Sequence, residues 1–318
     1  MTTPTAALLP QGPRGPQVRP TGRRGVLRPT ARRAEAVAGA LLAAPATLVF
    51  VVFMFVPLAL TLWFSLHEWG GFGPMTWVGG ENYTEIAGDP VFWKAFGNTI
   101  VFTVLTVPLG MALGLLAAVL LNRALPARGL LRALVYVPVV VSGVAAGVIF
   151  LRLFDPIRGV VNQVAGTLGL PQVDWQSSGT AALASVVVVV TWQGVGFAMV
   201  VYLAALQGVP REVYEAAAVD GAGPGRTFRS ITWPLLAPTT WFLVVYSVIL
   251  SFQAFDVVYV LTRGGPGTST TFLVQYAYDQ GFTQLRQGYA AALGVIIYVV
   301  VLALTVVQWR VSRRGGDA

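Results

Sequence analysis

The chain has 318 residues, of which 55% are hydrophobic and only 11% are charged. Soluble globular proteins carry about 25% charged residues, so this composition excludes an ordinary soluble domain and favours a membrane protein. The net charge of +8 at pH 7 raises nucleic-acid binding as an alternative. The position of the basic residues along the chain decides between the two.

Six stretches without charged residues are long enough to cross a bilayer, which takes about 20 predominantly apolar residues. We therefore expect an all-α, polytopic membrane protein with six transmembrane helices. In the second stretch, Gly110 and Gly114 form a small-xxx-small pair, which lets a neighbouring helix approach closely. The predicted helices cover residues 38–64, 97–121, 131–153, 182–206, 239–260 and 289–309.

Basic residues fall mainly on one side of these six helices. With the N-terminus in the cytoplasm, sixteen of the 21 Lys and Arg residues lie on the cytoplasmic side. This bias follows the positive-inside rule, so we expect both termini in the cytoplasm and no nucleic-acid partner. The five basic residues on the outer side are Lys94, Arg152, Arg158, Arg263 and Arg286.

Composition also defines the domain organisation. Residues 1–35 are rich in Pro, Arg, Gly and Thr, which predicts a disordered basic cytoplasmic tail. Residues 36–312 form the six-helix domain, and residues 313–318 form a short cytoplasmic tail. The chain has no cysteine and a single histidine, His67, so it excludes disulfides and histidine clusters, and we expect no metal site.

The loop between the fourth and fifth predicted helices, residues 210–236, is rich in alanine and glycine. Pro210 and Glu212 favour the start of a short helix, which Gly221 ends. A second short helix follows until Pro234 breaks it. Two short helices joined by a glycine turn form a rigid projection against which another protein can pack closely. A segment lying on lipid would instead carry Trp, Leu and Lys.

This loop resembles the EAA loop of ABC importer permeases, although Trp233 stands where the family usually has Leu. The resemblance implies the type I ABC importer permease fold over roughly residues 40–312. The matching residues, in the family's spacing, are Glu215, Ala216, Ala217, Gly221, Ile231 and Pro234.

In that family the EAA loop sits in a cleft of a separate cytoplasmic ATPase and converts its closure into helix movement. The resemblance implies that Glu215 pairs with a basic residue of the ATPase and that Gly221 permits the turn. We expect no enzyme activity, because a phosphate-binding loop needs Gly-Lys-Ser/Thr and the only lysine is Lys94. We expect no cofactor in this chain, with ATP and Mg held by the partner. The implied coupling residues are Glu215, Ala216, Ala217, Asp220, Gly221, Ile231 and Pro234.

A second resemblance, over residues 250–274, is to the carbohydrate-type subgroup of these permeases. Weaker similarities are Asn98-Thr99 and the stretch 288–292. The glycines within 264–267 require a tight turn at the outer end of the fifth helix, which suits contact with a soluble substrate-delivery protein. A turn needed for folding alone explains the same residue types. The turn consists of Gly264, Gly265, Pro266 and Gly267.

Polar and aromatic side chains at membrane depth are costly unless they line a cavity, so they indicate a substrate path. Aromatic faces stack on sugar rings, while amides and carboxylates bind sugar hydroxyls. Hydrogen bonding between helices explains the glutamines almost as well. The candidates are Trp192, Gln193, Gln253, Phe255, Asp256 and Tyr259.

The predicted function is the permease subunit of an ATP-driven sugar importer in a bacterial cell membrane. The resemblance implies a heterodimer with a second, similar permease, two cytoplasmic ABC ATPase subunits, and a solute-binding protein outside the lipid bilayer. Glycerol phosphates or polyols are alternative cargo. An ion-coupled secondary carrier is a rival from another class, although Asp256 is the only acid near a membrane core. A channel is a further rival, without a pore motif.

Overall fold

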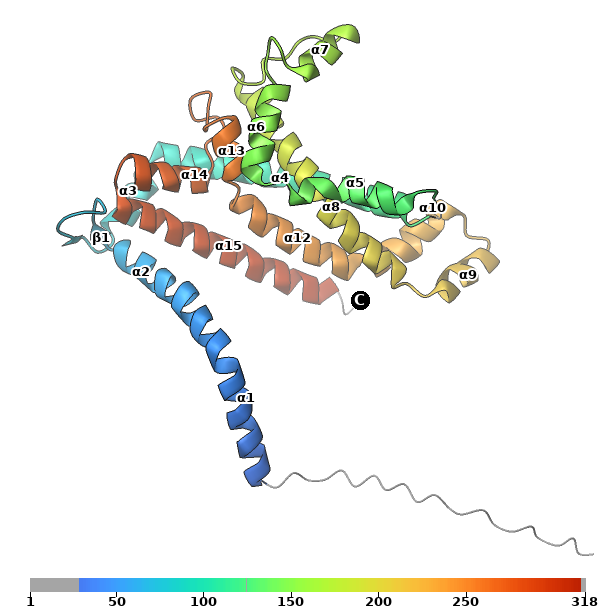
Figure 1. Cartoon of the computed structure of the whole chain (residues 1–318), viewed down its shortest axis with the longest axis horizontal. Helices are drawn as coiled ribbons and strands as arrows, with labels where there is room; N and C mark the ends of the chain where they lie inside the picture. Colours follow the sequence, from blue (N-terminus) through green and yellow to red (C-terminus); the bar gives the residue numbers. More distant parts are fainter. Residues whose placement is uncertain (1–28, 124, 316–318) are drawn as a thin grey trace, which may run out of the picture. The chain divides into compact units, whose positions relative to one another are not determined.

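The computed structural model describes residues 29–123 and 125–315, and almost all of its regular structure is helical (Figure 1). The described residues contain one small sheet, in which β1 (His67–Glu68) pairs antiparallel with β2 (Thr76–Trp77). The chain divides into two compact units, residues 1–57 and 58–318. The all-α fold predicted from composition is thus confirmed for the part of the chain that the structure describes.

The first predicted span is helical along its whole length. Helix α1 (Pro29–Phe50) leads into one π-helical turn, η1 (Val51–Phe55), and then into α2 (Val56–Phe64). A π turn holds one extra residue, and here it lies just before Pro57, which has no backbone N–H to donate. α1 begins inside the stretch 1–35 for which composition predicts disorder, and residues 1–28 lie outside the described part of the chain.

Four long helices form the body of the second unit (Figure 1). They are α4 (Pro90–Leu121), α8 (Gly179–Gln207), α12 (Ala237–Phe252) and α15 (Gln287–Gly315). α4 packs along both α8 and α12, and α15 packs along α12. α15 includes the first residues of the predicted tail 313–318, whose last three residues lie outside the described range.

Glycine and alanine bring α4 and α8 into close contact. A Cβ atom added at Gly114 would lie only 2.5 Å from the Cβ of Ala198, so no larger residue fits there without movement. This confirms that Gly114 serves helix packing. Gly110, the other member of the predicted pair, has open space around its Cα instead.

Two of the six predicted spans are broken. The predicted helix 131–153 consists of α5 (Arg128–Val140) and α6 (Gly143–Leu153), which meet at 100°. The predicted helix 239–260 stops at Phe252, and α13 (Asp256–Leu261) starts afresh beyond it. Four helices among the described residues are long and apolar enough to span a bilayer, and the number rises to six if two bent pairs each count as one span. These pairs are α5 with α6, and residues 224–235 with α12, which meet at 63°.

The first break has a local cause that charge-free composition does not reveal. Val141 adopts an extended conformation, with φ −75° and ψ 127°. The Oγ of Ser142 then accepts a 3.2 Å hydrogen bond from the backbone N–H of Ala145 and caps the start of α6. Ser142 therefore starts a new helix in a new direction.

The second break brings α13 against α6. A Cβ at Gly143 would lie 2.8 Å from the Cβ of Asp256, and one at Gly147 would lie 2.8 Å from the Cβ of Val260. These two glycines, four residues apart, form a small-xxx-small face that was not identified from the sequence. The remaining connections contain α7 (Val160–Thr167), which follows α6.

The end of the second unit opposite residues 210–236 is termed the far end. It carries the small sheet, α3 (Glu81–Gly88), α14 (Leu273–Tyr278) and a π turn, η3 (Asp279–Thr283) (Figure 1). Arg286 and Glu85 form an ion pair of 2.6 Å there, but both side chains are about half exposed, so it adds little stability.

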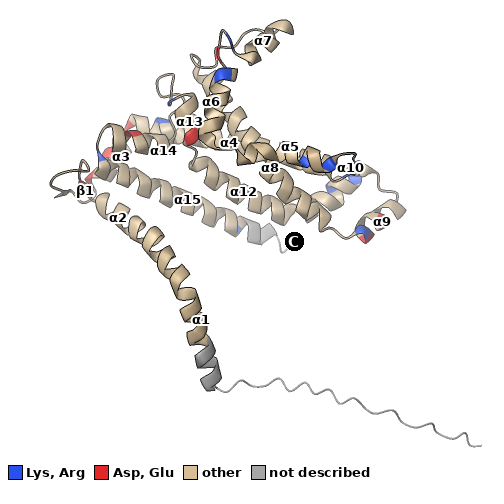
Figure 2. Cartoon of the chain, viewed as in Figure 1, with Lys and Arg blue, Asp and Glu red and all other residues tan. Residues whose placement is uncertain are grey.

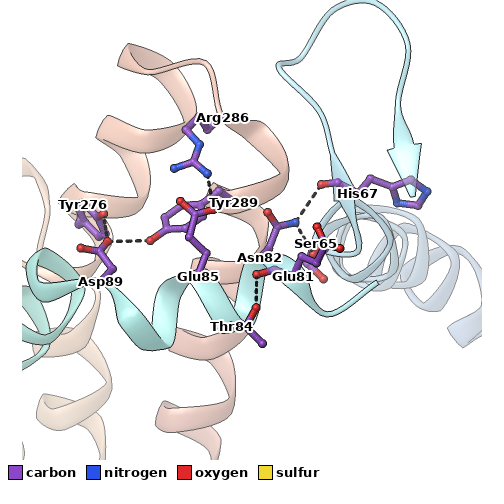
Figure 3. A network of polar contacts seen from close by, with 10 residues as sticks. All are labelled: Ser65, His67, Glu81, Asn82, Thr84, Glu85, Asp89, Tyr276, Arg286 and Tyr289. Atoms are coloured by element: carbon purple, nitrogen blue, oxygen red, sulfur yellow. Dashed lines mark hydrogen bonds and ion pairs between the residues drawn. The ribbon is translucent and has the colours of Figure 1, made fainter. Parts of the chain in front are cut away.

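A half-buried carboxylate, Asp89, joins three helices at the far end (Figure 3). Its Oδ1 accepts a 2.8 Å bond from the N–H of Val91 and caps α4. Its Oδ2 accepts hydrogen bonds from the hydroxyls of Tyr276 on α14 and Tyr289 on α15, the latter at 2.8 Å. Partial burial opposes ionisation, but these bonds outweigh it and hold the pKa of Asp89 below its usual value.

Acid should loosen this junction. Because the pKa of Asp89 in the folded protein lies below the ordinary value of 3.8, the unfolded chain binds the proton first as the pH falls. The contribution of the carboxylate to stability is complete above pH 3.8 and is lost as the pH falls through the lower, folded-state pKa. The melting temperature of the purified protein in detergent should therefore start to fall as the pH is lowered below about 4.

Asp89→Asn provides the comparison for this experiment. The variant should lose about 1 kcal/mol of stability at neutral pH, because it removes the charged acceptor of a half-exposed site. It should also show a shallower acid transition than the wild type. Glu68→Gln is the control, since Glu68 lies at the same end and is exposed. Identical acid transitions in the wild type and Asp89→Asn would contradict the role of this carboxylate.

Candidate functional site

A cavity of about 360 Å³ lies between α4, α8 and α12. None of the described residues that line it is charged. Apolar and small residues contribute much of the wall, among them Val139, Gly194 and Phe197. The polar lining consists of hydroxyls and one amide, from Thr106, Thr191, Gln193, Tyr246, Ser247 and Ser251.

The polar groups of this wall differ in how far the protein satisfies them. The Oγ1 of Thr191 is buried and has no hydrogen-bond partner among the described residues. The Oγ of Ser251 bonds the Oγ1 of Thr103 at 2.8 Å and donates to the carbonyl of Val248 at 2.8 Å. A buried hydroxyl without a partner costs free energy, so Thr191 is the least satisfied polar group of the wall.

Gln193 serves both the cavity and the break in the third span. Its Nε2 donates a 2.9 Å hydrogen bond to the carbonyl of Val141, the residue at which α5 ends. This bond is the helix-to-helix contact that was the alternative explanation for the glutamine. The same side chain lines the cavity, so the two interpretations are compatible.

The other predicted path residues lie away from this wall. Trp192 contacts Phe150 edge to face, with ring centroids 5.2 Å apart. Gln253 is exposed at the break after α12, and Asp256 lies against Gly143 at the start of α6. Phe255 and Tyr259 stack on each other at 5.2 Å. Of the six predicted residues, only Gln193 lines the cavity.

Sequence reasoning missed all five hydroxyl residues of the cavity. Ser247 and Ser251 stand four residues apart on α12, which places them on one face of the helix. That spacing inside a hydrophobic run was the available signal. Thr106 and Thr191 come from α4 and α8, and nothing local indicates that these two helices face the same space.

The EAA loop, residues 210–236, has the predicted form of two short helices around a glycine turn. The first is α9 (Arg211–Val219), and Gly221 follows it with φ +72°. The second is a composite of α10 (Pro224–Thr227), a π turn η2 (Phe228–Thr232) and α11 (Trp233–Leu235). The N–H of Ala222 donates to the carbonyl of Ala217 at 2.9 Å and closes the turn.

The exposed residues of the EAA loop form a surface available to another protein. Val219, at the end of α9, is 88% exposed. Ala217 is buried and Ile231 is half-buried, so these two anchor the loop rather than face outward. The predicted coupling residues that are exposed are Glu215, Ala216, Asp220, Gly221 and Pro234.

The predicted turn 264–267 is fixed mainly by hydrogen bonds within the chain. Gly264 has φ +82°, and its carbonyl accepts bonds from the Thr270 N–H at 3.0 Å and the Thr271 hydroxyl at 3.2 Å. The Nδ2 of Asn98 on α4 donates to the carbonyls of Thr268 and Thr271, at 2.8 and 3.1 Å. These contacts account for the presence of Asn98 and Gly264 without a partner protein, in agreement with the alternative that the turn is needed for folding alone.

Residues 110–315 match the family described as the binding-protein-dependent transport system inner membrane component. The chain belongs to this family. It is 37% identical over 276 residues to the sulfoquinovosyl glycerol transport system permease protein SmoG of Agrobacterium fabrum, covering 86% of this chain and 89% of that protein. The trehalose/maltose transport system permease protein MalF of Thermococcus litoralis is 34% identical, covering 89% and 96%.

Two further relatives extend the comparison. The sn-glycerol-3-phosphate transport system permease protein UgpA of Pectobacterium atrosepticum is 34% identical, covering 86% of this chain and 93% of its own. A bacterial ABC transporter that imports the acidic polysaccharide alginate has a subunit of similar structure, with a TM-score of 0.77 and 25% identity, covering 90% and 97%. The chain is therefore a permease subunit, not an enzyme, and the expected type I importer fold is confirmed.

A side chain at position 221 should destabilise the turn because of the backbone conformation there and not because of a steric clash. A Cβ at Gly221 meets nothing within 4 Å, but its φ of +72° is strained for any L-residue. Gly221→Ala should lower the stability of the permease by about 1 kcal/mol, measured as a drop in melting temperature.

Gly223→Ala is the matched control for this substitution. Gly223 also has open space around it, but its φ of −69° suits alanine. We expect Gly223→Ala to leave the melting temperature unchanged or to raise it slightly. Equal effects of the two substitutions would show that the left-handed conformation of Gly221 is not needed.

Proposed function

We propose that this permease forms half of the translocation path of an ATP-driven importer for an uncharged sugar. The observation that carries the proposal is the connection between the cavity and the EAA loop. The cavity is lined by α8 and α12, and the EAA loop joins these two helices along the chain. A protein that moves the EAA loop therefore pulls on two walls of the cavity.

The chemistry of the wall favours an uncharged cargo. The cavity offers hydroxyls and an amide, and none of its described lining residues is basic. A phosphate buried against such a wall would lack a compensating charge, which is costly, whereas sugar hydroxyls pair with hydroxyls and amides. This argues for a sugar, as in the name of the trehalose/maltose relative, over a glycerol phosphate, as in the name of UgpA.

The distribution of charge supports the proposed orientation in a bacterial cell membrane. Arginines gather around α5, α9 and α10, at the end that carries the EAA loop, while α8 and α12 carry no charged residue (Figure 2). With this end in the cytoplasm, the bias follows the positive-inside rule. Both termini would then be cytoplasmic, and the turn 264–267 would lie outside.

We further propose the assembly in which this permease works. A second, similar permease completes the cavity, and two ATPase subunits that hold ATP and Mg dock on the EAA loops. A solute-binding protein delivers the sugar from outside, as in the alginate transporter solved with its pentasaccharide-bound periplasmic protein. An ion-coupled carrier lacks support, because no acid lines the cavity among the described residues.

Sugar uptake by proteoliposomes tests the coupling. Vesicles that hold this permease with its partner subunits should take up sugar only with ATP inside and binding protein outside. Glu215→Lys should abolish uptake while leaving insertion and melting temperature intact, because Glu215 is exposed on α9. Glu212→Lys is the control on the same short helix, and it should retain most of the uptake. Uptake driven by a proton gradient alone would instead support a carrier.

Separate uptake measurements in the same vesicles test the cargo class. The uptake of radiolabelled maltose or trehalose should be compared with the uptake of radiolabelled sn-glycerol 3-phosphate, each in the presence of a binding protein that delivers it. We expect ATP-dependent uptake of the uncharged sugars and no measurable uptake of the phosphate, because the wall provides no basic residue. Efficient uptake of sn-glycerol 3-phosphate would overturn the uncharged-sugar assignment without affecting the importer assignment.

A further inference from the structure

Four aromatic rings gather at the far end, outside the cavity. Phe255 lies at the break after α12, Tyr259 on α13, Tyr278 at the end of α14, and Phe282 in η3. Their ring centroids are 5.2 Å apart for Phe255 and Tyr259, 5.0 Å for Phe255 and Tyr278, and 5.4 Å for Tyr259 and Tyr278. Phe282 joins the group through Tyr278, at 5.0 Å. These four residues are termed the aromatic platform.

The rings of the aromatic platform contact one another but are incompletely covered. Phe255 and Tyr259 are stacked, Tyr259 and Tyr278 meet edge to face, and such pairs add about 0.5–1.5 kcal/mol beyond burial. Even so, Phe282 is 66% exposed and Tyr259 is 37% exposed. Within the described residues, the hydroxyls of Tyr259 and Tyr278 have no hydrogen-bond partner. The platform thus presents partly exposed rings and free hydroxyls together, in a combination that a purely apolar contact does not need.

The platform is also continuous along the chain with the cavity wall. Ser251 is the last residue of α12 that lines the cavity, and Phe255 follows four residues later. Between them, Gln253 is exposed and offers an amide. The platform thus begins directly after the cavity-lining end of α12, next to the exposed amide of Gln253 in the sequence.

We propose that the aromatic platform is a stacking subsite for a pyranose ring of the cargo, next to the far end of the cavity. The C–H face of a pyranose is apolar and flat enough to stack on an aromatic ring, while its rim of hydroxyls can bond the Gln253 amide and the two tyrosine hydroxyls. Glycerol phosphates and open-chain polyols have no such face. This inference rests on the proposed function and narrows the cargo to sugars with a six-membered ring.

Substitution of Tyr278 separates a stacking role from a structural one. In the reconstituted vesicles, Tyr278→Leu keeps an apolar side chain but removes the ring, and should raise the KM for maltose or trehalose uptake about three- to tenfold. Tyr278→Phe keeps the ring and should restore most of the affinity. If both variants have the wild-type KM, or if Tyr278→Phe is as impaired as Tyr278→Leu, the stacking subsite is refuted.

Cysteine labelling tests occupancy directly, because the chain has no cysteine of its own. Phe282→Cys in the assembled transporter should react with a membrane-impermeant maleimide, and maltose or trehalose should slow that reaction several-fold. Addition of sn-glycerol 3-phosphate should not slow it. Phe72→Cys is the control, since Phe72 is 89% exposed and lies outside the platform. Its labelling should be insensitive to sugar.

Two results would overturn the proposal. One is labelling of Phe282→Cys that neither sugar slows. The other is labelling of Phe282→Cys in the isolated permease but not in the assembled transporter, whether or not sugar is present. That result would make the platform an interface with the second permease. If the proposed function itself were wrong, vesicles with the wild-type permease would take up no sugar in response to ATP. That result is distinct from the two results that would refute the subsite alone.

Discussion

The backbone of a helix inside a bilayer has no water to bond, so each break in such a helix must be compensated within the protein. In this permease the compensation at the first break comes from one side chain. The Nε2 of Gln193 on α8 donates to the carbonyl of Val141, where α5 ends, at 2.9 Å. With that carbonyl satisfied and Ser142 capping the next helix, the chain can turn through 100° inside an apolar environment.

The turn at Val141 determines which helices pack near the cavity. It sends α6 away from α5, and the glycine face of α6 then receives α13. α13 can reach this face only because α12 stops at Phe252. The two breaks thus depend on each other, and they leave a cavity on one side of α12 and the aromatic platform beyond its end. The amide that stabilises the first break also lines the cavity.

Local features of the fold could be predicted from the sequence, and non-local ones could not. The glycine turn at Gly221 was predictable because positive φ is a property of a single residue and its neighbours. The apolar runs indicated six spans, but composition does not reveal where the backbone bends within such a run, as it does at Ser142. The role of Asn98 depends on carbonyls 170 residues away, and the cavity depends on which faces of three helices meet. For that reason only Gln193 was correctly identified as a cavity residue.

The hydrogen bond between Ser251 and Thr103 has a mechanical consequence. It ties the far end of α12 to α4, at 2.8 Å, and α4 is in turn joined to α14 and α15 through Asp89. At the opposite end of α12, next to the EAA loop, the side-chain hydrogen bond to another long helix among the described residues is the 3.3 Å contact between Tyr202 and Thr240. We therefore expect α12 to tilt about its Ser251 end, which is tied to α4. Over its 16 residues, about 24 Å long, a tilt of about 5° would move the EAA end by about 2 Å. Ser251, the cavity residue at the fixed end, would stay almost still during such a tilt.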